Sequence, residues 1–457
     1  MSLEMGISKN LLKKFNNNLI LKQLKLDSKE MIKNIENLDI NNLQKNILNL
    51  YRPEYLSPFI PVNAKGPWII GSKGEIVYDV GGYGMLGLGH NPDWSREILS
   101  NSYVMANVMT ANIIQKEFTD NLMNHIGQNR EKGCPYSKFA VLNSGSEAME
   151  LALRIGELNL SKKNPANIVI KKGFHGRTGN AAKISDSSLA LYRKYLSSYQ
   201  SQEPVFSIEM NNWHECLEKF RLISSKYDIQ TVIAEPVMGE GDPGKMMSLQ
   251  FYRLLRRLTK EHNSTLIIDS VQAGFRCTGF LSASDYYHLA REDPPDIEIF
   301  SKAINGGQFP VSVLATTDEI FQKYKYGIYG NTMSSNPRAL AVCIEVLNQM
   351  TSEVQSNIRI MGKKLNESLQ ELKIKYPDFV THVSGTGLLQ AIHINHKYNV
   401  TELNGLEYLC RVNGLNVIHG GTNAIRLTPY FNINIEEIEL IQNILDKTFE
   451  EYLLKQK

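Results

Sequence analysis

Cysteine is scarce in this sequence, with five residues among 457 and none in a CxxC spacing. An odd number of scattered cysteines predicts neither a disulfide framework nor a zinc site, and we expect no bound metal. No apolar run approaches the roughly 20 residues that cross a bilayer, and the N-terminus lacks the apolar core and cleavage site of a signal peptide. These absences predict a cytoplasmic protein that does not contact a membrane.

An excess of one charge is also missing. Lys and Arg total 50 against 47 Asp and Glu, which gives a formal net charge of +3. Without a dense basic stripe the chain has little electrostatic attraction for nucleic acid, so we expect a small-molecule ligand. The content of 42% hydrophobic and 21% charged residues is typical of a globular protein of two or three lobes.

The order of the apolar segments predicts an α/β fold. Short strands rich in β-branched residues, such as NIVIKK, TVIAEP and STLIIDS, alternate with helical segments such as SLQFYRLLRRLTKEH. This alternation is typical of a mostly parallel sheet covered by helices. We expect a helical N-terminal extension over 1–50, the N-terminal part of a small domain over 51–105, a large α/β domain over 106–338, and a C-terminal small α+β domain over 339–457.

Two glycine-rich segments match phosphate-binding motifs only in part. Segment 82–87 has the GxGxxG spacing of nicotinamide and flavin enzymes, but the sequence HNP at 90–92 interrupts the helix that this motif requires. We expect a turn in a small sheet there. Segment 239–245 matches the first seven positions of a P-loop, but Met246 stands where Ser or Thr should bind magnesium. We therefore expect no nucleotide at either segment.

Polar residues recur where predicted strands end, which is where parallel sheets bind ligands. In NSGSEAME, Gly145 and Ser146 begin a helix, and their amides and hydroxyl could hold a phosphate, although a plain helix cap remains open. In GFHGRT, Phe174 and His175 offer an aromatic face that could stack on a planar cofactor or pack at a surface turn. Neither segment decides the function by itself.

Asp269 and Lys302 limit the kinds of cofactor that the site could bind. Asp269 ends the apolar run LII, where an unpaired buried carboxylate is costly, so it needs a cationic partner such as a protonated ring nitrogen, unless it caps a helix. Gln272 follows three residues later and could contact a ring substituent. Lys302 follows the apolar strand at 297–300 and precedes two glycines, which favours a lysine inside a sheet edge that reacts with carbonyl groups. A phosphate cradle, a pyridinium-pairing aspartate and a Schiff-base lysine together bind pyridoxal phosphate (PLP).

The chain resembles the class III aminotransferases, the PLP-dependent group that includes ornithine and 4-aminobutyrate aminotransferases. The likeness runs from about Tyr78 to the C-terminus and rests on an ordered set of motifs: DVGGYGMLGLGHNP, NSGSEAME, GFHGRT, AEPVMGEGD, IIDSVQAGFRCTG, FSKAINGG, GNTMSSNP and AIRLTPYFNI. It implies fold type I of the PLP-dependent transferases, with a large domain around a mostly parallel sheet and a smaller α+β domain from both chain ends. It also implies a homodimer or higher homo-oligomer with shared active sites.

The resemblance implies which residues do the chemistry. Lys302 and Asp269 would be catalytic: Lys302 would hold PLP as a Schiff base and move a proton, and Asp269 would pair with the pyridine nitrogen. Gln272 would lie near the ring oxygen.

Other residues would hold the cofactor in place, again by resemblance. Phe174 would stack on its ring with His175 beside it. Gly145 and Ser146 would bind the phosphate, joined by Thr332 from the neighbouring subunit.

Five residues would contact the substrates by the same resemblance. Arg426 would clamp the carboxylate of the amino acceptor, and Glu240 would neutralise this arginine when a substrate with an uncharged or cationic end is bound. Glu235 would lie near the substrate, and Arg177 and Tyr83 would contact the donor. This set implies a ping-pong transfer of an amino group from an ω-amino or diamino acid to a 2-oxo acid such as 2-oxoglutarate.

Three features of the sequence depart from the family pattern, so alternative functions stay open. The usual DEVQ reads DSVQ, so Ser270 replaces a glutamate, and the usual glycine-arginine pair becomes Arg276-Cys277. GNTMSSNP has serines where small aromatic residues and glycines are common. The alternatives are an aminomutase or amino-acid racemase on the same scaffold and a non-catalytic protein of this fold. A nicotinamide dehydrogenase, which would rest on segment 82–87 alone, comes last.

Overall fold

The structure, a computed structural model, describes residues 5–33, 40–52, 56–105, 107–159, 163–200, 204–287 and 293–456. The chain forms two compact units: unit 1 comprises Met1–Arg96 and Asn357–Lys457, and unit 2 comprises Glu97–Ser356. The smaller unit is thus assembled from both chain ends, as expected. The sequence-based domain boundaries lie at 105/106 and 338/339. Of the expected N-terminal extension, segments 1–4 and 34–39 lie outside the described residues.

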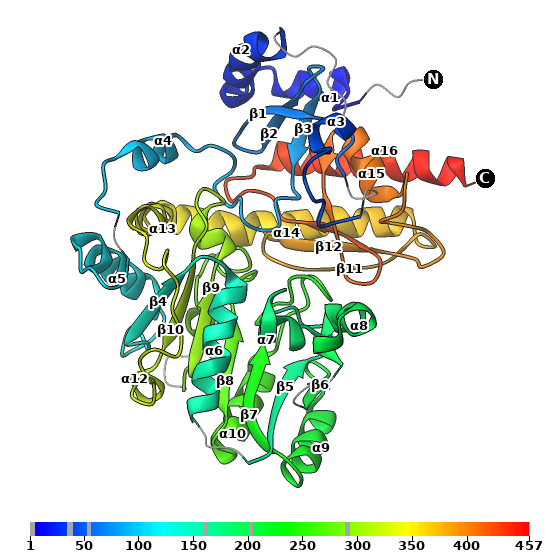
Figure 1. Ribbon diagram of the computed structural model, residues 1–457. Coiled ribbons are helices and arrows are strands. Elements are labelled where there is room, and N and C mark those ends of the chain that lie inside the picture. The colour runs from blue at the N-terminus through cyan, green and yellow to red at the C-terminus, as the bar shows by residue number, and fades with distance from the viewer. Residues whose placement is uncertain are drawn as a thin grey trace. The chain divides into compact units, whose positions relative to one another are not determined.

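Unit 2 is built on a seven-stranded sheet with the strand order β4-β10-β9-β8-β7-β5-β6 (Figure 1). Its strands are β4 (Lys138–Leu142), β5 (Pro165–Ile170), β6 (Val205–Ile208), β7 (Asp228–Ala234), β8 (Thr265–Asp269), β9 (Ile297–Phe300) and β10 (Ser312–Thr316). Strands β6, β5, β7, β8 and β9 pair in parallel, whereas β10 pairs antiparallel with both β9 and β4. The predicted mostly parallel sheet is confirmed.

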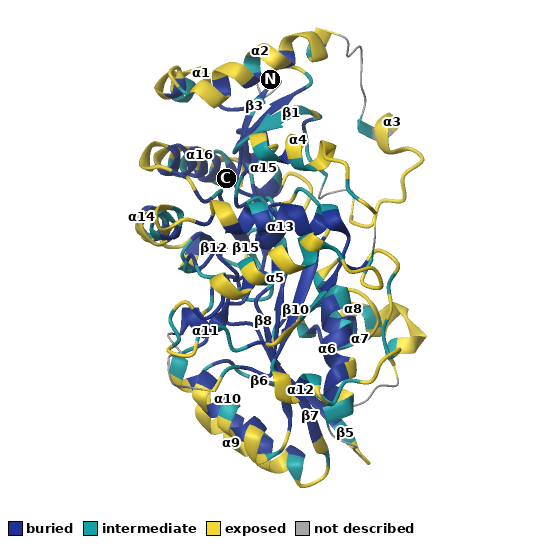
Figure 2. Cartoon of the chain, turned by 90° about the vertical axis from the view of Figure 1, so that its left-hand side faces the viewer, coloured by how far each residue is buried: buried dark blue, intermediate teal, exposed yellow. Residues whose placement is uncertain are grey.

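Helices cover both faces of this sheet. Those of unit 2 are α5 (Ile113–His125), α6 (Gly145–Asn159), α7 (Gly179–Lys183), α8 (Asp186–Tyr195), α9 (Trp213–Ser224), α10 (Leu249–Glu261), α11 (Ala283–Tyr286), α12 (Asp318–Phe321) and α13 (Pro337–Gln349), with the 3-10 helices η3 (Ser197–Tyr199) and η4 (Lys302–Asn305). Figure 2 shows α6 on one side of the strands and α9 and α10 on the other. Helix α4 (Asp93–Ser100) crosses the boundary between the units.

The core of unit 2 lies between α6 and the sheet. Met149 and Leu153 of α6 are buried against Ile233, Ile267 and Ile299 of the central strands. Burial of apolar surface on both faces explains why these strands read as continuous β-branched runs rather than as an alternating pattern. The parallel strands are thereby held with their carboxyl ends at one edge of the sheet.

In the part of unit 1 that the structure describes, there are two four-stranded sheets. One has the order β1 (Pro61–Lys65), β2 (Trp68–Gly71), β3 (Ile76–Asp79) and β13 (Leu415–Asn416), and the other has the order β11 (Val380–Thr386), β12 (Leu389–Ile394), β15 (Ala424–Leu427) and β14 (Ile418–Gly420). Its helices are α1 (Lys9–Leu12), the 3-10 helix η1 (Lys13–Phe15), α2 (Leu19–Lys33), α3 (Ile40–Gln44), most of α14 (Ser352–Lys375), α15 (Leu406–Val412) and α16 (Ile435–Lys455). No helix among the described residues has both the length and the apolar character to cross a membrane.

Segment 82–87 forms turns after β3 rather than opening a helix, in agreement with the expectation of a turn. A Cβ atom on Gly87 would lie 2.3 Å from the ring of Phe431. Glycine is therefore needed at this position for close packing inside unit 1, and the motif-like spacing has a structural cause.

The start of α16 buries a carboxylic acid. Asn434 accepts a hydrogen bond from the amide of Glu437 at 3.0 Å, and the Glu437 side chain accepts one from the amide of Asn434 at 3.0 Å, which is a capping box. Tyr430 Oη donates to Glu437 Oε2 at 3.2 Å. Burial raises the pKa of Glu437 from 4.5 to about 7, although these hydrogen bonds act in the opposite direction.

Because the pKa of Glu437 is raised in the folded chain, its stabilising contribution is present below about pH 4.5 and is lost as the pH rises through about 7. We expect Glu437→Gln, which keeps the cap, to remove this dependence. Between about pH 5 and pH 8, the unfolding free energy of the parent should fall by about 2 kcal/mol more than that of the variant. Denaturant titrations at several pH values measure this difference. If the unfolding free energies of the parent and the variant changed in parallel with pH, the assignment to Glu437 would be contradicted.

Candidate active site

Five strand ends of unit 2 bring expected site residues to one edge of the sheet. Ser146 follows β4 at the start of α6, Phe174 follows β5, Glu235 follows β7, Asp269 ends β8, and Lys302 follows β9. All five line one cavity of about 140 Å³. The same cavity is lined by Gly145, His175, Glu240 and Gln272. The structure therefore gathers in one place residues that are spread over more than half of unit 2.

Asp269 is buried and pairs with His175. His175 Nδ1 lies 2.8 Å from Asp269 Oδ2, and the amide of Val271 donates to Asp269 Oδ1 at 3.1 Å. Burial opposes a charge on His175, but the hydrogen bond and the charge of Asp269 outweigh it, so the pKa of His175 is raised. The sequence predicted the need for a cationic partner of Asp269, but it did not predict this imidazole.

Glu235 lies buried beside this pair. Its Oε1 accepts a hydrogen bond from the amide of Phe174 at 3.1 Å, and its Oε2 accepts one from the amide of Gly239 at 2.8 Å. Burial raises the pKa of Glu235 to about 7, partly offset by His175, and the charge of Asp269 adds to the rise. Two acids and one imidazole thus share a small buried volume.

Lys302 stands at the first position of η4 with a φ of 49°, followed by Gly306 and Gly307 with φ of 57° and 72°. A positive φ is strained for a lysine, and such strain persists only where the surrounding structure holds it. Its Nζ donates a hydrogen bond to Gln272 Oε1. Two residues that the sequence assigned to the same cofactor, Lys302 for its attachment and Gln272 for its ring oxygen, therefore meet at one cavity wall.

The cavity fits PLP by three features of the chain itself. A Cβ atom on Gly239 would lie 2.4 Å from Gln272 Cγ, and one on Gly176 would lie 2.6 Å from Ser146 Oγ, so the walls leave room only for glycine. The helix that Ser146 begins offers amides at its N-terminus for a phosphate. Among the described residues, Gln272 Nε2 is a buried donor without a hydrogen-bond partner, as a ring-contacting group would be before its ligand binds.

Arg177 and Glu240 form an ion pair beside the cavity. Arg177 Nη2 lies 3.5 Å from Glu240 Oε1, and its guanidinium carbon lies 5.2 Å from the centre of the Phe174 ring. The backbone amide of Arg177 donates to Ser146 Oγ at 3.2 Å. An arginine at this position could receive a substrate carboxylate when Glu240 releases it.

Two expected substrate residues belong to unit 1. Arg426 lies on β15 and is 2% exposed, whereas Tyr83 has a φ of 51° and is 45% exposed. Partial burial raises the pKa of Tyr83, with a further rise from Tyr51, while the charges of Arg411 and Arg426 act in the opposite direction. Tyr83 and Arg426 therefore share one electrostatic neighbourhood within this unit.

Thr332 does not line the cavity of Lys302. It is exposed and lines a second cavity of unit 2, of about 840 Å³, together with Phe139, Leu314 and Tyr329. The resemblance had placed Thr332 in the site of a neighbouring subunit.

Ser185 was missed by the sequence reasoning. Its hydroxyl is buried, accepts a hydrogen bond from the amide of His175 at 2.9 Å and lies 2.9 Å from the carbonyl oxygen of Gly176. It fixes the loop that carries Phe174 and His175. A serine in the run SDSS gives no local signal for this role.

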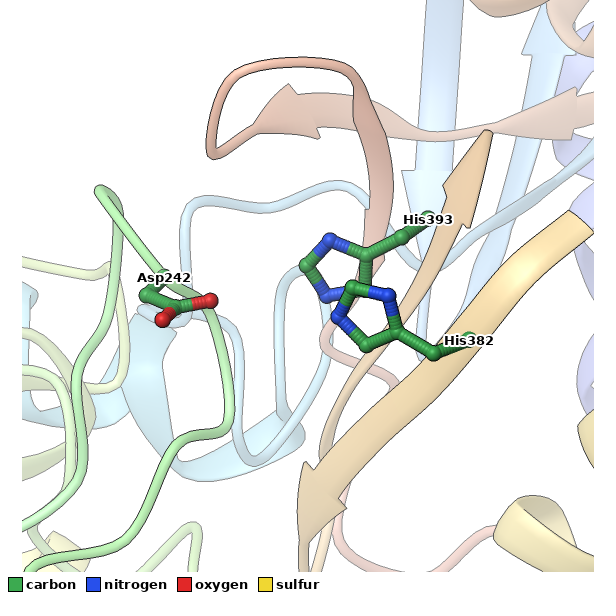
Figure 3. A group of neighbouring side chains, drawn as sticks. All are labelled: Asp242, His382 and His393. Atoms are coloured by element: carbon green, nitrogen blue, oxygen red, sulfur yellow. The ribbon is translucent and has the colours of Figure 1, made fainter. Parts of the chain in front are cut away.

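His382 and His393 face each other across β11 and β12 in unit 1 (Figure 3). Their ring centres lie 3.8 Å apart with the planes at 13°, and Ser384 Oγ lies 2.8 Å from His393 Nε2. Asp242, also drawn there, belongs to unit 2. Such parallel stacking is a packing contact of two imidazoles.

Comparisons with known proteins agree on one family. A family model described as "Aminotransferase class-III" matches residues 51–449. The mitochondrial acetylornithine aminotransferase of Yarrowia lipolytica is 30% identical over 405 residues, which cover 86% of this chain and 92% of that protein.

Two solved structures extend the likeness. Acetylornithine aminotransferase from Elizabethkingia anophelis is 25% identical, with a TM-score of 0.73 over 90% of this chain and 98% of that one. Ornithine aminotransferase from Toxoplasma gondii, in a structure described as having partial occupancy of PLP at its active site, has a TM-score of 0.78 at 20% identity, over 96% of this chain and 99% of that one, and shows the fold alone.

The tight packing of Gly239 against Gln272 predicts an effect on cofactor binding. Gly239→Ala should displace Gln272, lower stability by about 1–3 kcal/mol and weaken PLP binding about tenfold in a spectroscopic titration. Gly156→Ala is the matched control, because its Cβ would lie 2.4 Å from Thr231 Cγ2 in the core, away from the cavity. Equal losses of PLP affinity in the two variants would contradict the placement of Gln272.

Proposed function

The chain belongs to the class III aminotransferases, PLP-dependent enzymes that move an amino group from a donor to a 2-oxo acid, and we propose that Lys302 carries this reaction here. The observation that supports this role is the single cavity in which Lys302 meets Gln272, Asp269 and His175. Lys302 follows a buried strand and precedes two glycines. The amine of such a lysine can bond covalently to a carbonyl carbon, and after its release it can act as a base.

PLP, when bound, supplies an electron sink that makes a proton on the amine-bearing carbon of the substrate removable. Lys302 Nζ is the group that takes this proton and returns one. Asp269 would hold the protonated ring nitrogen, and its contact with His175 Nδ1 at 2.8 Å would keep this carboxylate in place. Gln272 would contact a ring substituent near Lys302, and Phe174 would stack on the ring.

The phosphate is held by Gly145 and Ser146 in this proposal. Ser146 Oγ accepts a hydrogen bond from the amide of Arg177. This hydrogen bond connects the expected phosphate site, at Ser146, to the expected donor site, at Arg177. Glu235 lines the same cavity and accepts a hydrogen bond from the amide of Phe174, so it would help to hold the segment that carries Phe174 and His175.

We propose a diamino acid or its N-acyl derivative, such as ornithine or N-acetylornithine, as the amino donor. The relatives named acetylornithine aminotransferase support this class, and Arg177 and Tyr83 are the residues that would contact the donor. Arg426 would bind the carboxylate of 2-oxoglutarate as the acceptor. By resemblance to the family, Glu240 would neutralise Arg426 while the donor is bound; within unit 2, Glu240 pairs with Arg177 at 3.5 Å.

We further propose a homodimer in which Thr332 completes the phosphate site of the other subunit. The cavity at Thr332 is lined mainly by apolar atoms, and exposed apolar side chains lie before α5 and at its first residue: Val104, Met105, Val108, Met109 and Ile113. A chain seldom exposes so many large apolar groups in one short stretch unless another surface covers them. A cytoplasmic location stays a prediction, since several relatives are named as mitochondrial proteins.

The first experiment adds amino donors to the purified PLP-loaded protein without an acceptor. With ornithine or N-acetylornithine, we expect the visible absorption band of the cofactor to disappear, and addition of 2-oxoglutarate should restore it. Lys302→Ala should lack the band and lose at least about 10³-fold in turnover. Lys363→Ala, at an exposed position of α14, is the control that should leave both unchanged.

Two outcomes would count against this proposal. Full activity of Lys302→Ala would refute the role of the lysine. Binding of PLP without a response to any donor would favour a mutase or racemase over a transaminase.

Mixing two impaired variants tests the shared site. Thr332→Ala should weaken phosphate binding, and a mixture of Thr332→Ala and Lys302→Ala subunits, exchanged in mild denaturant, should regain up to about a quarter of the parent activity. This follows because one site of each mixed dimer has both an intact Lys302 and an intact Thr332. If Thr332 serves the site of its own chain, the mixture should show no gain.

A further inference from the structure

Glu298 is a fully buried carboxylate in the middle of β9. Its neighbours in sequence, Ile297 and Ile299, belong to the apolar core beneath α6, so Glu298 points to the opposite face of the sheet. On β8, Ile268 is its register partner, one residue before Asp269. A buried carboxylate in a central strand is costly, and it persists only when hydrogen bonds replace its lost hydration.

Four donors surround the two oxygens of Glu298. Oε1 accepts hydrogen bonds from Ser270 Oγ at 2.5 Å and from the amide of Ala283 at 2.7 Å. Oε2 accepts hydrogen bonds from Tyr136 Oη at 2.7 Å and from Ser282 Oγ at 2.6 Å. Each of these donors is uncharged, and together they fill the acceptor capacity of the carboxylate.

These contacts hold both ends of one loop. The loop begins at Ser270, directly after Asp269, and ends at Ser282, which caps the short helix α11. Between the two ends it carries Gln272, the hydrogen-bond partner of Lys302. The interior of the loop is irregular, with Phe275 at a φ of 59°. Glu298 therefore connects the irregular segment that carries Gln272 to the strand that leads into Lys302.

We propose that Glu298 is a positioning residue of the transamination site, which clamps the loop from Ser270 to Ser282 so that Asp269, Gln272 and Lys302 keep their mutual placement. The inference rests on the proposed roles of these three residues. It assigns a function to a side chain that touches neither the cavity nor the expected substrates.

The clamp also accounts for Ser270, which stands where the family pattern usually has glutamate. In this chain the hydroxyl of Ser270 is a donor to Glu298, so the local carboxylate is supplied by β9 rather than by the residue after Asp269. A glutamate at position 270 would place a second buried carboxylate against the first, and the two charges would repel. The DSVQ sequence and Glu298 are therefore a matched pair.

The test compares Glu298→Gln with Asp296→Asn in the PLP-loaded enzyme. Asp296 is a second buried carboxylate, adjacent to the other end of β9, where it pairs with Arg256 at 2.8 Å and accepts a hydrogen bond from the amide of Leu266. Both variants should lower the unfolding temperature. Glu298→Gln turns an acceptor oxygen into an NH₂ group that faces two donors, so the clamp should open.

We expect Glu298→Gln alone to change the site. The dissociation rate of PLP should rise about tenfold, kcat should fall more than KM changes, and the pH at which the cofactor spectrum changes should shift. Asp296→Asn should leave these three quantities within about twofold of the parent enzyme. Equal effects of the two variants at equal loss of unfolding temperature would show that Glu298 is merely structural and would overturn the inference.

Three further variants keep the test decisive if Glu298→Gln fails to fold. Ser270→Ala removes one of the four hydrogen bonds and should cause the same changes to a smaller extent. Ser270→Glu should be severely impaired, and Ser270→Glu combined with Glu298→Ser should recover PLP retention. Absence of any change in Ser270→Ala, together with no recovery in the double variant, would also overturn the inference.

The parent enzyme separates this inference from the proposed function. A parent without transaminase activity or a cofactor band would refute the proposed function. An active parent whose Glu298 and Asp296 variants behave alike would refute the clamp alone.

Discussion

The burial of the Asp269 carboxylate at the end of β8 is the constraint on which the site depends. An anion in this position loses its hydration, and it is compensated by the imidazole of His175 and the amide of Val271. The loop after β5 must therefore approach β8 closely, which requires Ser185 beneath it and places Phe174 over the cavity. One electrostatic requirement thus sets the geometry of two loops.

The burial of Asp269 also helps to explain the raised pKa of Glu235. A second acid near Asp269 meets both a low dielectric and a like charge, and its pKa rises to about 7. The cluster has one imidazole for two carboxylic acids, and a protonated ring nitrogen would give Asp269 a second hydrogen-bonding partner. PLP with a protonated ring is a ligand of that kind, and the family to which the chain belongs uses it.

The cavity is held rigid by the strands and by the buried carboxylate of Glu298. Glu298 and Asp269 lie on neighbouring parallel strands, one facing the loop network and the other ending at the cavity. Lys302, separated from the end of β9 by Ser301, keeps a left-handed backbone conformation, which only a firmly held strand end can sustain. The chemical groups of unit 2 therefore form one preorganised set, whereas Tyr83 and Arg426 belong to the other unit.

The sequence alone determined the α/β class and the positions of Ser146, Phe174, Asp269 and Lys302 at strand ends, because apolar runs and the turn residues after them are local signals. It also indicated the family, through an ordered set of motifs. Only the tertiary structure decided that His175 pairs with Asp269, 94 residues away, that Ser185 supports this loop, and that Glu298 joins Ser270 and Tyr136, which lie 28 and 162 residues from it. A lone glutamate in a strand or a serine in a polar run carries no local pattern, and its role arises only when folding brings distant donors within hydrogen-bond distance and excludes water from them.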